Sequence, residues 1–469
     1  FGLFKKTPRD RQIIEAAENH HFTVKADFSY LERSVRSPAA ELAIHERGDK
    51  QGESFMPIMP PYMKQTLPDK QLDAIGYYLQ TLNTPWEQGP VIKLVESSGP
   101  EKYDPLQDDL QFLVTDSVRL QRGPMEGLSA RSIHVGQPNA VNYSFDPRIL
   151  GVAKVWQGGF LDMTGELTNR GGDGLKTGFE TREIDLGDAG VLFAPLNTRG
   201  EPIDFSFKEA VFRDMEAVKN ALWSDKDQAE LIAQQNAQFL GYERPSKDKA
   251  AAPTFRYRVG KNTLAVTTDI ADSGAVTISV TGERPAEQRF MVGVDALSGV
   301  QVSAGQLVDG VWLLPKGDSH AELSATIALA GNAWSPKPTD FNYRQQPLTR
   351  VEAVADLPAG YAIENYLPPQ DNYGRDQLFE ALGLALADDG TIVVATRTAG
   401  IWRIKDGQWH LFAEGLFDSL GVQIEDEHGL QLVVGQKAEL TRITDTDGDG
   451  MGDKFETLFD AHGYHGNYH

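Results

Sequence analysis

A run of carboxylates near the C-terminal end of the sequence has the spacing of a cation-binding loop. Acidic side chains stand at positions 1, 3, 5, 9 and 12 of a twelve-residue stretch, namely Asp445, Asp447, Asp449, Asp453 and Glu456. Gly450 at position 6 allows a sharp backbone turn, and Met451 at position 7 would offer its backbone carbonyl. Calcium binds about six to eight oxygen ligands, and this spacing wraps them around one point. We therefore predict a Ca²⁺ site at Asp445–Glu456, with a solvated acidic turn as the alternative.

The residues before this loop indicate what kind of calcium site it is. The segment Leu440–Thr444 has the composition of a strand rather than of a helix. A calcium sensor of the EF-hand type would have a helix on each side of the loop. We therefore expect a structural calcium loop between strands.

Three histidines follow the loop at short spacing, His462, His465 and His469. Imidazole nitrogens are common ligands of transition metals, so this spacing permits a second metal site. A turn with incidental histidines, or a cofactor-related role for them, is the favoured alternative. No phosphate-binding loop, nucleophile elbow or dinucleotide fingerprint is present in the sequence.

Composition narrows the classes of partner. The 469 residues include 45 Lys and Arg against 67 Asp and Glu, which gives a formal net charge of −22. Such a charge disfavours nucleic acid and anionic lipid and favours divalent cations and basic partners. The sequence has no cysteine, which excludes disulfides and thiolate metal sites. It also has no apolar run of about 18 residues, so we expect no membrane span.

The chain is too long for a single core, and its patterns change along its length. Residues 1–90 read as helical, with helices expected at Arg11–Asn19, at Tyr30–His45 and after Pro68, where Leu72 and Ile75 begin an apolar face. Residues 110–245 have an all-β pattern with a helical insert at Met215–Leu222 and Ala229–Leu240, and residues 253–335 alternate like a β-sandwich. Short strands over 358–469 indicate the first four-stranded blades of a β-propeller.

The helical part resembles the C-terminal half of a class I c-type cytochrome. Over residues 30–83, the loop Met-Pro-Pro-Tyr before the helix Leu-Pro-Asp-Lys-Gln-Leu resembles the axial-methionine loop of that family. The resemblance implies haem c, with Met59 as the axial ligand and Met56 as the alternate. The attachment motif Cys-x-x-Cys-His is absent, so the chain as given offers no covalent attachment point for haem.

The last part resembles the opening of the propeller in the sorbosone and glucose dehydrogenase group of quinoproteins. The matching segments are Thr391–Arg403, Phe412–Leu416, Gln436–Arg442 and Asp445–Asp453. The resemblance implies periplasmic enzymes that oxidise a sugar or alcohol with pyrroloquinoline quinone and pass electrons to a cytochrome c as redox partner. It implies that His465, or else His469, takes the hydroxyl proton. Arg397 and Gln436 stand at strand ends where the central channel and its cofactor would lie.

Residues 115–215 resemble an uncharacterised β-domain found in fusions of cytochrome and propeller domains, on Val141-Asn-Tyr-Ser-Phe and Val155-Trp-Gln-Gly-Gly. Phe1 is not an initiator Met, and the chain stops in a Gly/His/Tyr-rich turn, so we expect a longer exported protein. The fold class expected is multidomain and mainly β, with a small all-α cytochrome c-like domain, a β-sandwich middle and the start of a β-propeller. Two functions follow: a periplasmic or extracellular oxidoreductase, or a non-catalytic calcium-stabilised binding or assembly component.

Overall fold

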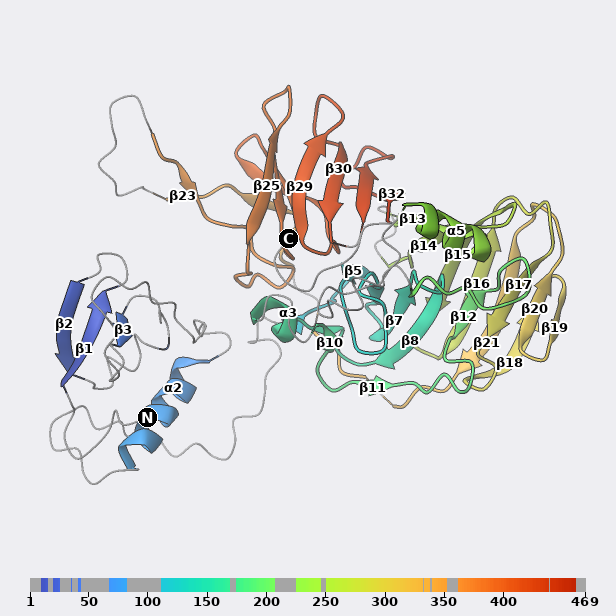
Figure 1. Cartoon of the computed structure of the whole chain (residues 1–469), viewed down its shortest axis with the longest axis horizontal. Helices are drawn as coiled ribbons and strands as arrows, with labels where there is room; N and C mark the ends of the chain where they lie inside the picture. Colours follow the sequence, from blue (N-terminus) through green and yellow to red (C-terminus); the bar gives the residue numbers. More distant parts are fainter. Residues whose placement is uncertain are drawn as a thin grey trace. The chain divides into compact units, whose positions relative to one another are not determined.

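The computed structural model divides the chain into two compact units, Phe1–Asp108 and Asp109–His469. The structure describes residues 10–15, 20–25, 35, 41–43, 67–81, 111–168, 174–206, 225–245, 250–331, 333–337, 340–351, 362–437 and 439–460. Within these residues it is mainly β, with several antiparallel sheets that do not close on themselves (Figure 1). Among them, no helix is long and apolar enough to cross a membrane.

The first unit contains a small sheet where the sequence predicted helices. Strand β1 (Asp10–Glu15) pairs with β2 (His20–Lys25) and with β3 (Glu41–Ala43). The helix predicted at Arg11–Asn19 is therefore wrong over residues 11–15, and Glu41–Ala43, within the one predicted at Tyr30–His45, form a strand. The β-branched pair in β1 and the alternation of Phe22 and Val24 in β2 favour a hairpin, in which Ile13 lies opposite Phe22. A cytochrome-like all-α domain is not shown.

The helix predicted after Pro68 is confirmed as α2 (Asp69–Thr81). The Pro68 carbonyl accepts the N–H groups of Gln71 and Leu72, and Asp69 places a negative charge in the first turn. Leu72 is buried, but Ile75 is exposed, so the predicted apolar face is covered only in part.

Two large sheets dominate the second unit. The nine-stranded sheet has the order β19-β20-β17-β12-β8-β7-β6-β5, and β11 pairs with β8. Its strands are β5 (Arg119–Arg122), β6 (Ile133–Gly136), β7 (Val141–Asp146), β8 (Gly151–Gln157), β11 (Arg182–Glu183), β12 (Phe193–Pro195), β17 (Gln288–Val292), β19 (Gln306–Val308) and β20 (Val311–Leu314).

The ten-stranded sheet has the order β18-β21-β16-β15-β14-β13-β32-β31-β30-β29. Its strands are β13 (Ala237–Glu243), β14 (Thr254–Val259), β15 (Asn262–Ile270), β16 (Ala275–Thr281), β18 (Leu297–Val302), β21 (Ala321–Ile327), β29 (Ser419–Ile424), β30 (Gln431–Gln436), β31 (Leu440–Thr444) and β32 (Lys454–Phe459).

The two sheets share one apolar core. Phe145 of β7 stacks on Phe255 of β14 with ring centroids 3.9 Å apart, which joins the nine-stranded sheet to the ten-stranded one. Strands from the predicted segments 110–245 and 253–335 contribute to both sheets. Alternation along a strand indicates which side chains are buried, but it does not specify the neighbouring strand, so the sequence could not show this shared core.

The second helix of the predicted insert, Ala229–Leu240, lies earlier in the chain than predicted. Helix α5 (Asp225–Gln235) ends at Asn236, which has a φ of 50° and closes the last turn by donating its N–H to the Ile232 carbonyl. The residues from Ala237 onward, predicted as the end of the helix, form β13 instead. The other predicted helix, Met215–Leu222, lies outside the described residues.

Two four-stranded antiparallel meanders follow each other in the predicted propeller segment. The first consists of β25 (Ala381–Leu386), β26 (Ile392–Thr396), β27 (Ile401–Lys405) and β28 (Gln408–Ala413), and β22 (Gln345–Pro347) adds a fifth strand to it. The two large sheets, which share one core, form the sandwich. The second meander, β29–β32, belongs to its ten-stranded sheet, because β32 pairs with β13 (Figure 1). The blade-like units are present, but no ring of blades is seen among the described residues, and the propeller stays a prediction.

Close approach of β32 and β13 depends on a glycine. A Cβ added at Gly241 would lie 1.9 Å from the Phe455 carbonyl oxygen, and Gly241 has a φ of 118°.

The small remaining elements are β4 (Gln111–Phe112), β9 (Leu161–Asp162), β10 (Lys176–Thr177), β23 (Arg350–Val351), β24 (Asn365–Tyr366) and α3 (Thr164–Thr168).

Candidate metal centre

The acidic loop predicted from the sequence lies between β31 and β32. Carboxylate oxygens of Asp445, Asp447 and Asp449 lie within 4.8 Å of one another. The two oxygens of Asp445 accept the N–H groups of Gly448 and Gly450 at 2.7 and 2.9 Å. Both glycines have left-handed backbone, with φ of 79° and 90°, which a residue with a Cβ rarely adopts. The glycine expected at the turn is therefore where the loop needs it.

Backbone amides also orient the other two carboxylates of this cluster. Asp447 accepts the N–H of Asp449 at 3.3 Å, and Asp449 accepts the N–H of Met451 at 2.9 Å. Three negative charges held this close repel one another unless a cation lies between them. Hard carboxylate oxygens are the donors that Ca²⁺ prefers, so these three residues fit the ion, and backbone carbonyls or water would complete its coordination.

The remaining predicted ligands have other contacts. Asp453 is buried and accepts hydrogen bonds from the N–H and hydroxyl of Thr446, at 3.0 and 2.7 Å. Glu456 lies on β32 and pairs with Lys454 at 2.9 Å. The structure thus brings three of the five predicted acidic ligands together and gives Asp453 and Glu456 other partners, so the full twelve-residue ligand set stays a prediction.

The end of the loop connects three parts of the second unit. Gly452 donates its N–H to the Phe412 carbonyl of β28, and the Asp453 carbonyl accepts the N–H of Arg244 next to β13, each at 2.8 Å. A Cβ on Gly452 would lie 2.4 Å from a methyl group of Ile443 in β31. A cation held by Asp445, Asp447 and Asp449 would therefore stabilise the point where the sandwich meets both meanders.

The two residues predicted to face a quinone cofactor are buried in protein contacts. The Arg397 guanidinium pairs with Glu166 and Glu380 at 3.0 Å and with Asp418 at 3.2 Å. The Gln436 side chain donates to the Thr441 hydroxyl at 2.8 Å and accepts the Phe417 N–H at 2.9 Å. Both side chains thus contact the segment Phe417–Asp418. Their polar atoms are bonded to the protein, so they do not fit a cofactor site open to substrate.

Charge in this buried cluster is unevenly balanced. Lys437 adds a second cation, 2.5 Å from Asp418, so two cations face the carboxylates of Glu166, Glu380 and Asp418. Burial and the Asp418 charge raise the pKa of Glu166 to about 6, although Arg397 and Lys437 act in the opposite direction. Sequence reasoning missed Glu166 and Lys437, because they lie far from each other in the chain and no local pattern marks them.

A second buried ion cluster joins the sandwich to the first meander. Glu414, which follows β28, pairs with Arg119 of β5 at 2.9 Å and with Arg244 at 3.1 Å. The Arg119 guanidinium also lies 4.1 Å from the ring centre of Phe112. Burial alone would raise the pKa of Glu414, but the two arginines hold it below its usual value. Such fully paired charges position elements and leave no group free for chemistry.

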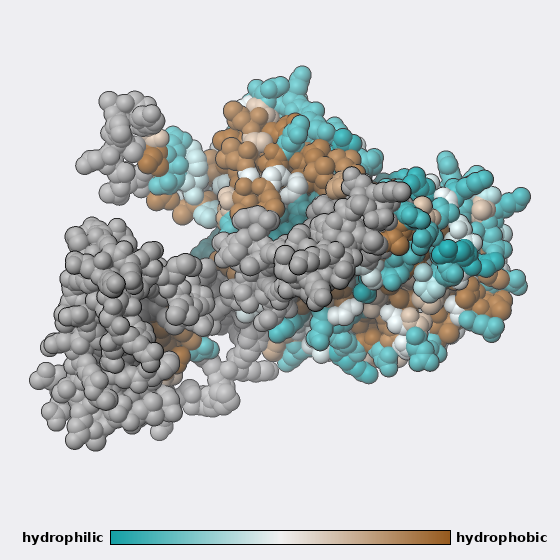
Figure 2. All heavy atoms as spheres, viewed as in Figure 1, coloured by the Kyte–Doolittle hydropathy of each residue, from teal (hydrophilic) through white to brown (hydrophobic). Residues whose placement is uncertain are grey.

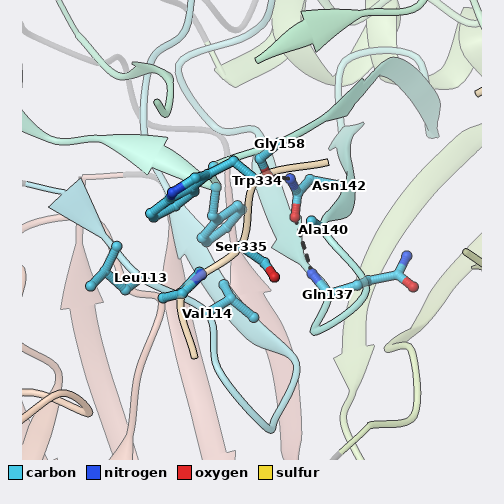
Figure 3. Close-up of a pocket in the computed structure, with 11 residues that line it drawn as sticks. Leu113, Val114, Gln137, Ala140, Asn142, Gly158, Trp334 and Ser335 are labelled. Carbon is cyan, nitrogen blue, oxygen red and sulfur yellow. Dashed lines mark hydrogen bonds between the residues drawn. The ribbon is translucent and has the colours of Figure 1, made fainter. Parts of the chain in front are cut away.

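Two cavities of the second unit have few ionisable lining residues. The cavity in Figure 3, between Val114, Asn142, Gly158 and Trp334, has a volume of about 10 Å³, which is room for about one water molecule. A wider groove of about 720 Å³ is lined by prolines and carboxamides. Among its described lining residues, Asp376 alone is ionisable, so they supply no acid–base pair.

The other predicted site residues, Met56, Met59, His465 and His469, lie outside the described residues, as does His462. No protein-family model matches the sequence, and no curated protein matches it. Among solved structures, an active YidC insertase with its first transmembrane domain resolved is 13% identical, over 46% of this chain and 42% of that one, with a TM-score of 0.23. A TM-score this low does not indicate a shared fold.

Proposed function

We propose that this chain is a calcium-stabilised, non-catalytic binding or assembly component of an exported complex. The observation that carries the proposal is the convergence of the Asp445, Asp447 and Asp449 carboxylates at the junction of the sandwich and the two meanders. Calcium is abundant outside the cell, and a site of this type strengthens a fold wherever the ion is present.

The non-catalytic part of the proposal rests on how the polar groups are used. The side chains expected to serve a cofactor, Arg397 and Gln436, have protein partners, and so do the buried charges around Glu414. A catalytic group must be free to exchange a proton or to contact substrate. These groups instead hold distant segments together, which is the task of a scaffold.

Thermal unfolding of the full chain, with EDTA and then with increasing CaCl₂, tests the calcium site. Binding to the folded state alone should raise the midpoint, and at a hundredfold excess over Kd the added stability is about 2.7 kcal/mol. MgCl₂ should give a smaller shift, because Mg²⁺ demands stricter geometry and releases its water reluctantly.

Matched variants make the result specific. Asp445→Asn should remove the calcium-dependent shift, because it takes away a ligand at the centre of the cluster. Asp272→Asn, which changes an exposed acid in the turn between β15 and β16, should retain it. A midpoint that does not respond to calcium, or a shift that survives Asp445→Asn, would contradict the proposal.

One observation favours a second candidate, the oxidation of a sugar or alcohol by a quinoprotein. Two consecutive four-stranded meanders, β25–β28 and β29–β32, match the blade pattern of such propellers. His465 or His469 would then take the hydroxyl proton, and a cytochrome c-like partner would accept the electrons. The test is dye reduction by the full chain with pyrroloquinoline quinone, Ca²⁺ and glucose or ethanol. Dye reduction that is lost in His465→Ala and His469→Ala would favour this candidate. No dye reduction by the wild type would reject it.

A further inference from the structure

Strand β25 carries an uncovered row of leucines. Leu384 and Leu386 are 70% and 67% exposed, and Leu382 is exposed as well. Figure 2 shows the corresponding brown area over β25 and β29. Large aliphatic side chains in a regular row on a strand are unusual on a free surface, and contiguous apolar patches mark interaction sites.

Farther from β25, side chains on the same sheet face are buried or partly buried. Leu384 lies opposite Val394 and Leu386 opposite Ile392, so these leucines share a face with both β26 residues. Farther along this face, Val394, Trp402 and Trp409 are buried under side chains that include Phe341 and Phe379. The leucines of β25 thus lie on the same sheet face as this buried cluster, but outside the side chains that cover it.

The outer backbone edge of β25 is unpaired among the described residues, and β29 packs against the strand at Gly383 without pairing with it. β25 is the last strand of its sheet. Ala387 donates its N–H to the Thr391 carbonyl. In an antiparallel pair, alternate residues point their backbone N–H and C=O groups toward the partner strand. The N–H and C=O groups of Leu384 and Leu386 therefore point away from β26. Among the described residues, no other strand pairs with them.

Features that usually protect an edge strand are missing here. Proteins protect such edges with Lys, Pro or charged residues that point inward. Residues 381–386 read Ala-Leu-Gly-Leu-Ala-Leu and contain none of these. A register shift between Ala381 and Gly383 distorts only the start of the strand, so the stretch from Leu384 to Leu386 is regular.

Acidic residues surround the end of this edge. Asp388 and Asp389 follow β25 directly, and the Asp389 N–H donates to the carbonyl of Glu427 in the next turn. Lys405 pairs with Asp389, whereas Asp388 and Glu427 are exposed. A partner for this surface therefore needs basic residues beside its apolar ones. A second copy of the chain, with its net charge of −22, would bring like charges together.

We propose that β25 is a docking edge for an extended segment of a partner protein, with alternating apolar residues followed by Lys or Arg. The apolar side chains would cover Leu384 and Leu386, and the backbone would pair with the outer edge in parallel with β25. In that orientation the basic C-terminal end would meet Asp388 and Glu427. This inference rests on the proposed role as a binding component, but it does not depend on the calcium loop.

A designed peptide can serve as the probe. Fluorescein-labelled Thr-Val-Thr-Val-Thr-Val-Lys-Lys is titrated with the full chain in saturating CaCl₂, and the binding is followed by fluorescence anisotropy. The same peptide ending in Glu-Glu should bind at least tenfold more weakly, and NaCl should weaken binding of the basic peptide. Equal binding of the two peptides, or no saturable binding, would overturn the proposal.

Variants separate the apolar contact from the backbone pairing. Leu384→Thr with Leu386→Thr keeps the strand and removes the apolar row, and Leu386→Pro removes one outward N–H group while the ladder to β26 is kept. Each should weaken binding at least tenfold. Val308→Thr, an exposed position on the terminal strand β19, should leave binding unchanged. Wild-type affinity in the leucine variants would overturn the proposal.

Light scattering of the free chain gives an independent answer. A monomer is expected. A dimer that dissociates in the Leu384→Thr/Leu386→Thr variant would assign the edge to a second copy and overturn the choice of partner. The calcium site is tested by the calcium-dependent shift of the unfolding midpoint, and the docking edge is tested by peptide binding. A failure of one proposal can therefore be told apart from a failure of the other.

Discussion

The Arg397 Nη2 atom lies 3.0 Å from the Glu166 Oε1 atom, although the two residues are 231 positions apart in the chain. Glu166 belongs to α3, and Arg397 follows β26, so the contact joins the sandwich segment to the first meander. Both side chains are buried, which makes this pair a part of the interior rather than of the surface.

Removing the arginine should be costly. Arg397→Met would leave Glu166 and Asp418 buried without their shared cation, and breaking a buried pair in this way destabilises a protein by about 3 kcal/mol or more. Urea unfolding measures the change. Arg350→Ala, which breaks an exposed pair with Glu364, should change the free energy of unfolding by less than about 1 kcal/mol. Equal losses in the two variants would contradict the buried role of Arg397.

Removing the carboxylate should alter the pH dependence of stability. The pKa of Glu166 is raised to about 6 in the folded protein from 4.5, so the folded state binds this proton more tightly than the unfolded state. The group therefore contributes stability that is full below about 4.5 and is lost as the pH rises through about 6. Glu166→Gln should become less stable relative to the wild type as the pH falls from 7 to 4.5. A difference that is constant with pH would contradict this.

Gly241 of β13, where the pairing with β14 shifts register, gives a test of the joint between the sandwich and the second meander. Gly241→Ala would place a Cβ 1.9 Å from the Phe455 carbonyl oxygen, so it should destabilise the fold by more than about 1 kcal/mol. Gly435→Ala in β30 meets no atom within 4 Å and should be neutral or slightly stabilising. Chemical unfolding of both variants measures the contrast, and a neutral Gly241→Ala would mean that β13 and β32 do not approach as described.

Local chemistry was predictable from the sequence, and long-range partnerships were not. The carboxylates of Asp445, Asp447 and Asp449 converge because all three lie within one short loop, and the Pro68 helix start is equally local. In contrast, no local pattern indicates that Glu166 would contact Arg397, or that β32 would extend the ten-stranded sheet. The helix predicted at Arg11–Asn19 failed because pairing with β2 outweighs a weak helical periodicity.

A buried histidine should act on stability in the opposite direction to Glu166. His134 lies on β6; its Nε2 donates to the Gly123 carbonyl at 3.0 Å, so its Nδ1 accepts the Ser144 hydroxyl at 2.7 Å. Burial lowers the pKa of this imidazole to about 4, because the charged form loses its hydration there. The folded state thus holds His134 neutral, and this contribution to stability is full above about 6.5 and is lost as the pH falls toward 4.

The wild-type curve contains both effects in overlapping pH ranges, so single variants are needed to separate them. His134→Gln removes the titrating group and keeps an amide that can bond to Gly123 or Ser144. It costs stability at pH 7 by disturbing a buried site, but this cost should shrink as the pH is lowered from 6.5 to 4, because only the wild type must bury an imidazole that would otherwise be protonated. Urea unfolding across this range measures the difference, and a cost that grows toward pH 4 would show that His134 is protonated in the folded protein.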